Sequence, residues 1–160
     1  MSADERTYAE STVVAATPQQ VYDLVSDVTR TGEWSPICRE CWWDEGDGPR
    51  VGAWFTGRNE VPGRTWQTRS QVVVADPGEQ FAWVVGGAYA RWAFTLAAVD
   101  GGTEVTESWH FLPAGLDRFV ELYADDAPAQ IEDRTRAAHA GIPATLAAIA
   151  AIAASGQLAT

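Results

Sequence analysis

Three side chains in this sequence could do chemistry inside an enclosed, apolar site. Side chains alternate along a β-strand, so residues of equal parity share one face. Glu107 therefore shares a face with Val105 and Trp109, and Asn59 likewise lies on an apolar face. A carboxyl group in apolar surroundings holds its proton more tightly and can act as a general acid or base. His139, on a predicted helix, is the second candidate for that role.

Each of these side chains also has a structural interpretation. A buried carboxylate is costly unless it is paired, so Glu107 either pairs with an arginine such as Arg58 or Arg134, or lies in a wet cavity. Asn59 either caps backbone groups at a strand end or orients a ligand. His139 reaches either the cavity or solvent, and a lone helical histidine is usually not catalytic.

Cys38 and Cys41 form a C-x-x-C motif. A redox pair usually sits at a helix N-terminus, whereas the two tryptophans that follow here are typical of a strand. A zinc site would need two further ligands, and His110 and His139 are the only histidines. We interpret the pair as two reduced, partly buried thiols, and we expect no metal and no cofactor.

Other catalytic signatures are missing from the sequence. It contains no glycine-rich phosphate loop after a predicted strand, no G-x-S-x-G and no H-E-x-x-H. All eleven basic residues are arginine, which excludes lysine Schiff-base chemistry. Strand alternation puts Glu40 and Asp44 on one face and Glu45 on the other, as expected for a solvated rim.

The elements that must position these residues are mostly strands. Turn residues separate seven segments that are rich in strand-forming residues, which predicts an antiparallel meander. The predicted strands are 7–15, 37–45, 51–60, 64–75, 79–86, 89–99 and 103–112.

Helices are predicted after the first strand and after the last. Thr17 can cap a helix that has Pro18 at its first position, the pair 31–32 ends it, and residues 33–36 form a second short helix or turn. After the last strand, residues 116–123 are expected to be helical, and a new, long helix starts at residues 125–128 and runs to about 154. Together these elements predict an α+β fold, in which one long helix covers a seven-stranded curved antiparallel sheet.

The long helix contains an alanine-rich run and Pro143, which we expect to kink it. Alanine contributes too little to bilayer insertion, so we predict a buried helix and no membrane span. Small helix residues facing large sheet residues leave space for a cavity. The alanines expected to leave this room are Ala147, Ala148, Ala150 and Ala151.

Aromatic residues supply the predicted lining of that cavity. The sequence has eight tryptophans, and parity places several on the inward face while Trp42 and Trp43 cannot share one. Tyr123 lines the cavity mouth or covers the sheet edge. The predicted ligand-binding residues are Phe55, Asn59, Trp66, Trp83, Trp92, Phe94, Glu107, Trp109 and Tyr123.

Length and charge narrow the function classes. The 160 residues suit one domain, 1–160, and the net charge of -11 argues against nucleic acid or an anionic membrane surface as a partner. The N-terminal residues carry no apolar stretch of the kind found in secretory signals, so we expect a cytoplasmic protein. We expect a monomer or a weak homodimer.

Several stretches resemble the START-like helix-grip superfamily (SRPBCC), in its polyketide cyclase/dehydrase and lipid-transport branch. The similar stretches are TPQQVYDLVSDVTRTGEWSP (17–36), VGAWFTGRN (51–59), TWQTRSQVVVADPGEQFAW (65–83), RWAFTL (91–96), GTEVTESW (102–109) and GIPATL (141–146). The resemblance implies a sheet that grips a long helix around a hydrophobic cavity. The residues at recurring positions of the branch are Trp34, Asn59, Trp66, Trp83, Trp92 and Glu107.

Three functional hypotheses follow. We favour a non-catalytic protein that binds a small hydrophobic ligand such as a lipid or polyketide, for transport or sequestration. The alternative is a polyketide cyclase or dehydratase that uses Glu107 or His139 as general acid/base. The third is a protein-interaction partner that exposes an apolar patch on its C-terminal helix.

Overall fold

A computed structural model describes residues 6–46 and 48–158 and shows one seven-stranded antiparallel sheet. The strands lie in the order β1-β7-β6-β5-β4-β3-β2, so β2 to β7 form a meander and β1 joins its far edge. Their bounds are β1 Thr7–Val14, β2 Cys38–Trp43, β3 Trp54–Val61, β4 Arg64–Asp76, β5 Gln80–Val85, β6 Ala90–Val99 and β7 Gly102–Phe111.

The strand predictions are confirmed, with small shifts at the ends. β3 begins at Trp54 because residues 51–52 form a turn. The turn predicted at 46–49 includes Asp47, which lies outside the described residues, as does the N-terminal segment 1–5. Register shifts mark two β-bulges, one in β2 between Cys38 and Glu40 and one in β4.

Two helices follow β1, as predicted, but the break between them falls earlier. The Thr17 hydroxyl oxygen accepts a hydrogen bond from the Gln20 backbone N–H, and the Gln20 side-chain oxygen accepts one from the Thr17 backbone N–H. The helix α1 (Pro18–Ser26) therefore starts with a capping box. Asp27 then leaves the helical conformation and caps the 3₁₀ turn η2 (Val28–Arg30). The short helix α2 (Thr31–Trp34) follows directly.

The pair 31–32 thus lies inside α2 instead of ending α1. Gly32 is required there by packing, because a Cβ at that position would come within 2.5 Å of the Arg39 carbonyl oxygen. The missing side chain lets α2 lie against the start of β2.

The C-terminal half is helical. α3 (Pro113–Tyr123) and the 3₁₀ turn η3 (Ala124–Asp126) lead into α4, which runs unbroken from Ala127 to Ala154. Pro143 lies inside α4 on its exposed side. A proline cannot donate to the carbonyl one turn earlier, here that of His139, which is also exposed. Water can therefore satisfy that carbonyl, and the helix continues.

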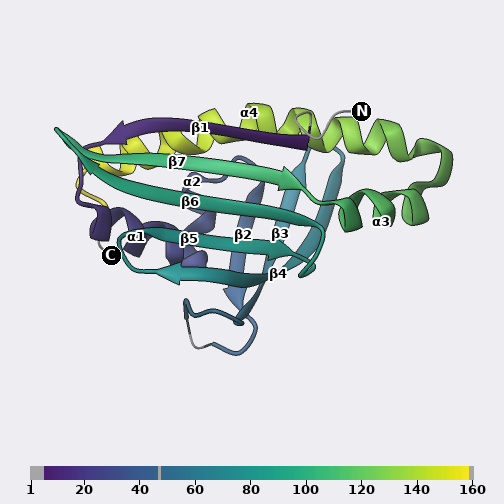
Figure 1. The fold of residues 1–160 in the computed structure, drawn as a ribbon, viewed down its shortest axis with the longest axis horizontal. Coiled ribbons are helices and arrows are strands. Elements are labelled where there is room, and N and C mark those ends of the chain that lie inside the picture. Colours follow the sequence, from purple (N-terminus) through teal and green to yellow (C-terminus); the bar gives the residue numbers. More distant parts are fainter. Residues whose placement is uncertain (1–5, 47, 159–160) are drawn as a thin grey trace.

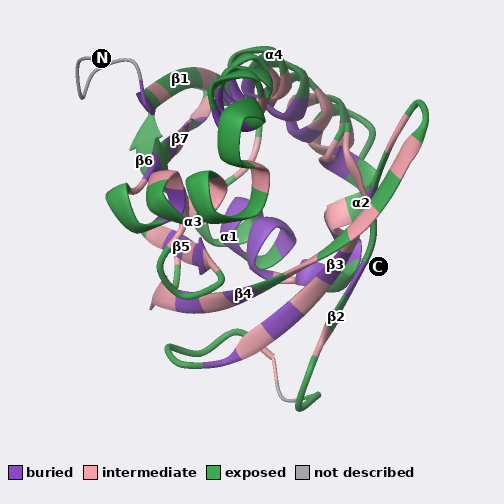
Figure 2. Ribbon diagram, turned by 90° about the vertical axis from the view of Figure 1, so that its right-hand side faces the viewer, coloured by how far each residue is buried: buried purple, intermediate pink, exposed green. Residues whose placement is uncertain are grey.

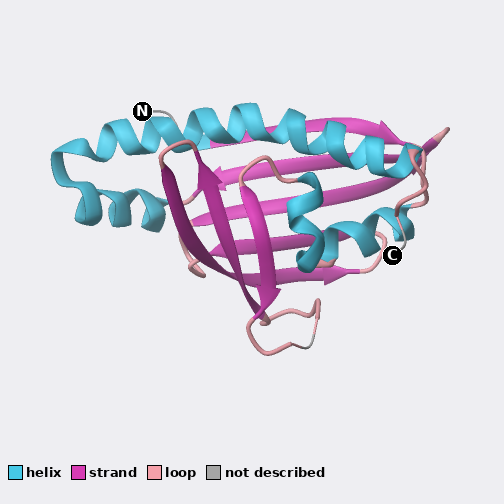
Figure 3. Ribbon diagram, turned by 180° about the vertical axis from the view of Figure 1, so that it is seen from behind, coloured by secondary structure: helices cyan, strands magenta, loops and turns pink. Residues whose placement is uncertain are grey.

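The sheet curves around α4, which runs along β1 and also contacts β7 and α2 (Figure 1, Figure 3). Seen from the side, α4 and α1 bury residues between the two arms of the sheet (Figure 2). The core joins apolar residues of α1, the sheet and α4; its fully buried members include Leu24, Phe81, Phe94, Ile142 and Ile149. The α+β helix-grip prediction is confirmed.

By length and composition, the helical stretch Pro113–Ala154 could cross a bilayer. In this fold α4 packs instead on β1 and β7 and buries Ile131, Ile142, Leu146 and Ile149. We therefore assign α4 as the core helix of the domain.

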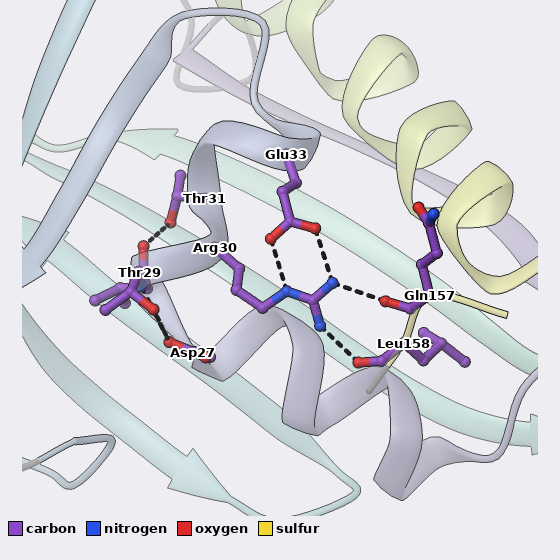
Figure 4. Close-up of polar contacts among 8 residues, drawn as sticks. Asp27, Thr29, Arg30, Thr31, Glu33, Gln157 and Leu158 are labelled. Carbon is purple, nitrogen blue, oxygen red and sulfur yellow. Dashed lines mark hydrogen bonds and ion pairs between the residues drawn. The ribbon is translucent and has the colours of Figure 1, made fainter. Parts of the chain in front are cut away.

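A buried arginine fastens the end of the chain to α2 (Figure 4). Arg30 donates from Nε and Nη2 to the two carboxylate oxygens of Glu33, both at 2.7 Å. It also donates to the carbonyl oxygens of Leu158 at 2.6 Å and Gln157 at 2.7 Å. Bidentate charge-assisted bonds of this kind are strong, so the guanidinium fixes the segment after α4 against η2 and α2.

Candidate functional site

A cavity of about 370 Å³ lies between the concave face of the sheet, α2, α3 and α4. Its wall includes residues from β2 to β7, from the loop after α2, and from the part of α4 between Arg134 and Thr145. The cavity exists because each strand directs its apolar parity inward while α4 presents small residues opposite. Its volume falls in the range of small-molecule sites.

The structure brings most of the predicted ligand-binding residues together in this wall. Phe94 differs, because it is fully buried in the core, where its ring packs 5.3 Å from Trp34 and 5.8 Å from Trp83. The predicted residues that line the cavity are Phe55, Asn59, Trp66, Trp83, Trp92, Glu107, Trp109 and Tyr123.

An aromatic wall runs across neighbouring strands. Trp83 pairs with Trp92 across β5 and β6, and Trp92 pairs with Trp109 across β6 and β7. The Trp83 and Trp92 rings are nearly parallel, with centroids 6.4 Å apart and an interplanar angle of 10°. Phe55 meets the edge of Trp83 at 6.2 Å. These rings offer flat apolar surface to a ligand.

Asn59 is buried, and its role is not that of a backbone cap. Its side-chain amide donates to the Thr68 hydroxyl at 3.0 Å across β3 and β4. Both residues line the cavity. The pair forms a small polar spot in an otherwise apolar wall.

Glu107 is the buried carboxyl of the site, with 3% of its surface exposed. Its Oε1 atom has no hydrogen-bond partner among the described residues. The two arginines considered from the sequence bind elsewhere: Arg58 pairs with Glu40 and Glu60, and Arg134 pairs with Asp133. The structure therefore does not support the ion-pair interpretation.

Burial raises the pKa of Glu107 well above its ordinary value. A carboxyl that keeps its proton near neutral pH can donate a hydrogen bond to an oxygen, or give up the proton as a general acid. Trp34 supplies a second free donor, because its buried Nε1 also has no partner among the described residues and its ring lines the same cavity.

His139, the other acid/base candidate, lies outside the cavity. Its side chain is exposed, and its ring packs against Tyr8 with centroids 4.1 Å apart. The phase of α4 turns this residue towards β1, away from the aromatic wall. Of the two candidates, only Glu107 reaches the cavity.

Two wall residues, Phe119 and Arg134, were not predicted as part of the site. Phe119 of α3 packs on Tyr123 and on Phe111. The guanidinium of Arg134 lies over the Phe119 ring at 5.4 Å and near the Trp66 ring at 5.9 Å. The spacing of Phe119 and Tyr123, one helical turn apart, was the available signal for α3.

The small residues that make room on α4 also differ from the predicted ones. The alanines at 147 and 151 are exposed, and none of the four predicted alanines lines the cavity. The small residues that do line it lie earlier, at Ala137, Ala138, Gly141 and Thr145. A Cβ at Gly141 would meet only Pro36, at 3.7 Å, so the space beside this glycine is otherwise open.

Comparison with known proteins agrees with this architecture. Residues 5–144 match the family described as polyketide cyclase / dehydrase and lipid transport. The Polyketide_cyc-like protein Cgl2372 from Corynebacterium glutamicum is 51% identical, with a TM-score of 0.68 over 91% of this chain and 90% of that one. No curated protein matches this chain.

More distant structures share the fold alone. Protein NE0264 from Nitrosomonas europaea is 14% identical, with a TM-score of 0.70 over 99% of this chain and 100% of that one. The di-domain ARO/CYC StfQ from the steffimycin biosynthetic pathway is 15% identical, with a TM-score of 0.72 over 96% of this chain and 53% of that one.

The family match and the fold support a role in ligand binding or cyclisation. The match extends over most of the described chain, from before β1 to the middle of α4. This chain belongs to the polyketide cyclase/dehydrase and lipid transport family.

Proposed function

We propose that the protein binds one small hydrophobic ligand that carries at least one oxygen, such as an aromatic polyketide or an oxygenated lipid. The observation that carries this proposal is an aromatic cavity wall that also contains Glu107 and Trp34. Each of these two residues has a buried polar atom, Oε1 and Nε1 respectively, without a partner among the described residues. A hydrocarbon would leave both atoms without a partner. An oxygen-bearing ligand, or water in its absence, satisfies them.

The apolar and the polar residues of the cavity wall contribute differently to ligand recognition. Burial of apolar ligand surface against Trp83 and Trp92 supplies affinity, at about 25 cal/mol per Å². The protonated Glu107 and the Trp34 N–H both donate, so they select ligand oxygens that accept. The Asn59–Thr68 pair adds polar groups on the β3–β4 side.

Transport or sequestration fits this arrangement, because the wall holds a ligand with few groups that could transform it. We expect the protein to act in the cytoplasm, as a monomer or weak homodimer. Neither location nor assembly is needed for the binding proposal.

Tryptophan emission tests the proposal directly. Fatty acids, hydroxylated fatty acids and polycyclic aromatic ketones are titrated while emission and melting temperature are followed. We expect saturable quenching by the oxygenated compounds and a higher melting temperature. Trp83→Phe should lose much of the quenching, whereas Trp42→Phe should keep it, because Trp42 is exposed and does not line the cavity. Unchanged emission across the panel would refute ligand binding.

The second candidate function is that of a cyclase or dehydratase with Glu107 as the general acid. The observation in its favour is the same buried carboxyl without a partner, whose pKa is raised by burial, in an apolar cavity wall. Glu107→Gln should then abolish turnover of a hydroxylated ligand while leaving its binding within a few fold. Full turnover by the Gln variant on an established substrate would exclude Glu107 from catalysis.

A further inference from the structure

A β-bulge brings the two cysteines of the protein to the same side of strand β2. In a regular strand, residues three apart point to opposite faces. The register of β2 against β3 shifts between Cys38 and Glu40, which inserts an extra residue. Cys38 and Cys41 therefore both face the cavity, and both are free thiols that line it.

Gly57 on the neighbouring strand marks how close the two sulfur atoms are. A Cβ at that position would lie 3.1 Å from Cys38 Sγ and 3.8 Å from Cys41 Sγ. Both sulfur atoms therefore lie next to the position that a side chain at Gly57 would occupy. Cys38 Sγ also donates to the Glu40 carbonyl at 3.4 Å, across the bulge.

The two thiols differ in access and in acidity. Cys38 is half-buried, whereas Cys41 is 6% exposed. A hydrogen bond from Cys41 lowers the pKa of Cys38 against the opposing effect of burial. The same hydrogen bond, together with burial, raises the pKa of Cys41. One accessible, more acidic thiol beside a buried, less acidic one is the arrangement of an attacking and a resolving cysteine.

We propose that Cys38 and Cys41 form a reversible dithiol–disulfide site in the cavity wall, which reacts with disulfides of low-molecular-weight thiols. The Cys38 thiolate attacks one sulfur of the small disulfide, its S–S bond breaks, and one thiolate leaves and takes up a proton. Cys41 then loses its proton and attacks Cys38 Sγ, which releases the second small thiol. The protein loses two protons and two electrons, and the small disulfide gains them.

A zinc site does not fit the same residues. Structural zinc takes four ligands, and no group of three or more histidine, cysteine or acidic side chains in the described residues could hold a metal. The pair is therefore better suited to sulfur exchange than to metal binding.

Oxidation would also change the ligand site. A disulfide bond is about 2.05 Å long, so its formation must draw the two sulfurs together and reshape the bulged part of β2. Both sulfurs border the cavity, so ligand affinity should depend on their redox state. This consequence rests on the proposed ligand-binding function, whereas formation of the disulfide does not.

Intact-mass measurement of the full chain tests the site. The protein is incubated with excess oxidised glutathione, and free thiols are counted after denaturation. We expect the wild type to lose two hydrogens and both free thiols without retaining glutathione. Cys41→Ala should instead accumulate a glutathione adduct on Cys38. Cys38→Ala should react at least about ten-fold more slowly, because the remaining thiol is buried.

Two results would overturn the site: a wild type that keeps both thiols while the urea-denatured chain oxidises, or one that holds a stable glutathione adduct. The dependence of ligand binding on the redox state of the two cysteines is measured separately, from Nile red emission of the reduced and oxidised wild type. Emission that changes when the wild type is oxidised, but not when Cys38→Ala is treated in the same way, supports this coupling. Equal emission of the wild type in both redox states refutes it. Absence of Nile red binding in either state counts against the proposed function while leaving the disulfide result intact.

Discussion

Two carboxyl groups of this domain, Glu33 and Glu107, have opposite surroundings. Glu33 receives two hydrogen bonds from Arg30, and these lower its pKa. Glu107 is buried in the cavity wall with a free oxygen, and burial raises its pKa. The comparison teaches that a carboxylate paired with a buried arginine helps to hold the fold together, whereas a buried carboxyl without a partner is available to a ligand.

Loss of Arg30, the hydrogen-bond partner of Glu33, should have the largest effect on stability. Arg30→Ala deletes four hydrogen bonds and detaches the segment at Gln157 and Leu158. We expect a loss of about 2–4 kcal/mol in the free energy of unfolding, measured by urea denaturation. Arg118→Ala is the matched control, because Arg118 forms an exposed pair with Glu121 and should cost less than about 0.5 kcal/mol. Equal losses in the two variants would contradict the distinction.

Replacement of Glu107, the carboxyl without a partner, should instead stabilise the fold at neutral pH. Below the ordinary glutamate pKa near 4.5 both states hold the proton, but above it the unfolded state loses the proton while folded Glu107 keeps it. Wild-type stability is therefore lost as pH rises towards the folded pKa. Glu107→Gln should be more stable than wild type at neutral pH. The gain should be about 1.4 kcal/mol for each pH unit between the ordinary pKa and the lower of the folded pKa and the working pH.

That gain should shrink as the pH falls towards about 4.5, the ordinary pKa of glutamate, and should be absent below it. Urea titrations of the wild type and the variant at several pH values check the sign. A Gln variant that is less stable than wild type at every pH would mean that Glu107 serves the fold. Glu33→Gln should show the opposite trend, with a loss at neutral pH that disappears in acid.

Trp34 Nε1, the second buried atom of the cavity wall without a partner among the described residues, provides a further test. Trp34→Phe keeps most of the ring and removes the N–H, so oxygenated ligands should bind about five- to ten-fold more weakly, as expected for one hydrogen bond. Binding of a hydrocarbon of similar size should change little. Calorimetric titration of both ligand types provides the measurement. An equal loss for the two types would assign Trp34 a packing role alone.

The smallest predicted effect comes from the helix side of the cavity. Gly141→Ala adds a methyl group where only Pro36 lies within 4 Å, and it removes the flexibility of a mid-helix glycine. We expect a gain of about 0.5–1 kcal/mol in stability. Thermal unfolding measures it, with Ala144→Gly on the exposed side of α4 as the opposite change. A destabilised Gly141→Ala would show that the cavity is filled beside α4.

Strand parity predicted much of the site. Trp83, Trp92 and Trp109 line the cavity because β5, β6 and β7 pair without a register shift, so their side chains alternate regularly between the two faces of the sheet. The same rule placed Glu107 inward, although it could not say that the carboxyl lacks a partner. That depends on where distant arginines lie.

The rest of the site depends on features that no local pattern encodes. Cys38 and Cys41 share a face only because β2 bulges between them. His139 points away because the phase of α4 against the sheet is set by the whole core. Phe119 lines the cavity because α3 packs beside it. The apolar spacing in α3 predicts a helix but does not show which part of the fold that helix packs against.

The protonation state of Glu107 tests the central claim most directly. Infrared difference spectra of wild type minus Glu107→Gln, recorded at neutral pH, isolate the carbonyl stretch of this carboxyl. The account predicts a protonated-carboxyl band that shifts when the best oxygenated ligand of the emission titration is added. A carboxylate signal at neutral pH, or a protonated band that ignores a bound ligand, would contradict it.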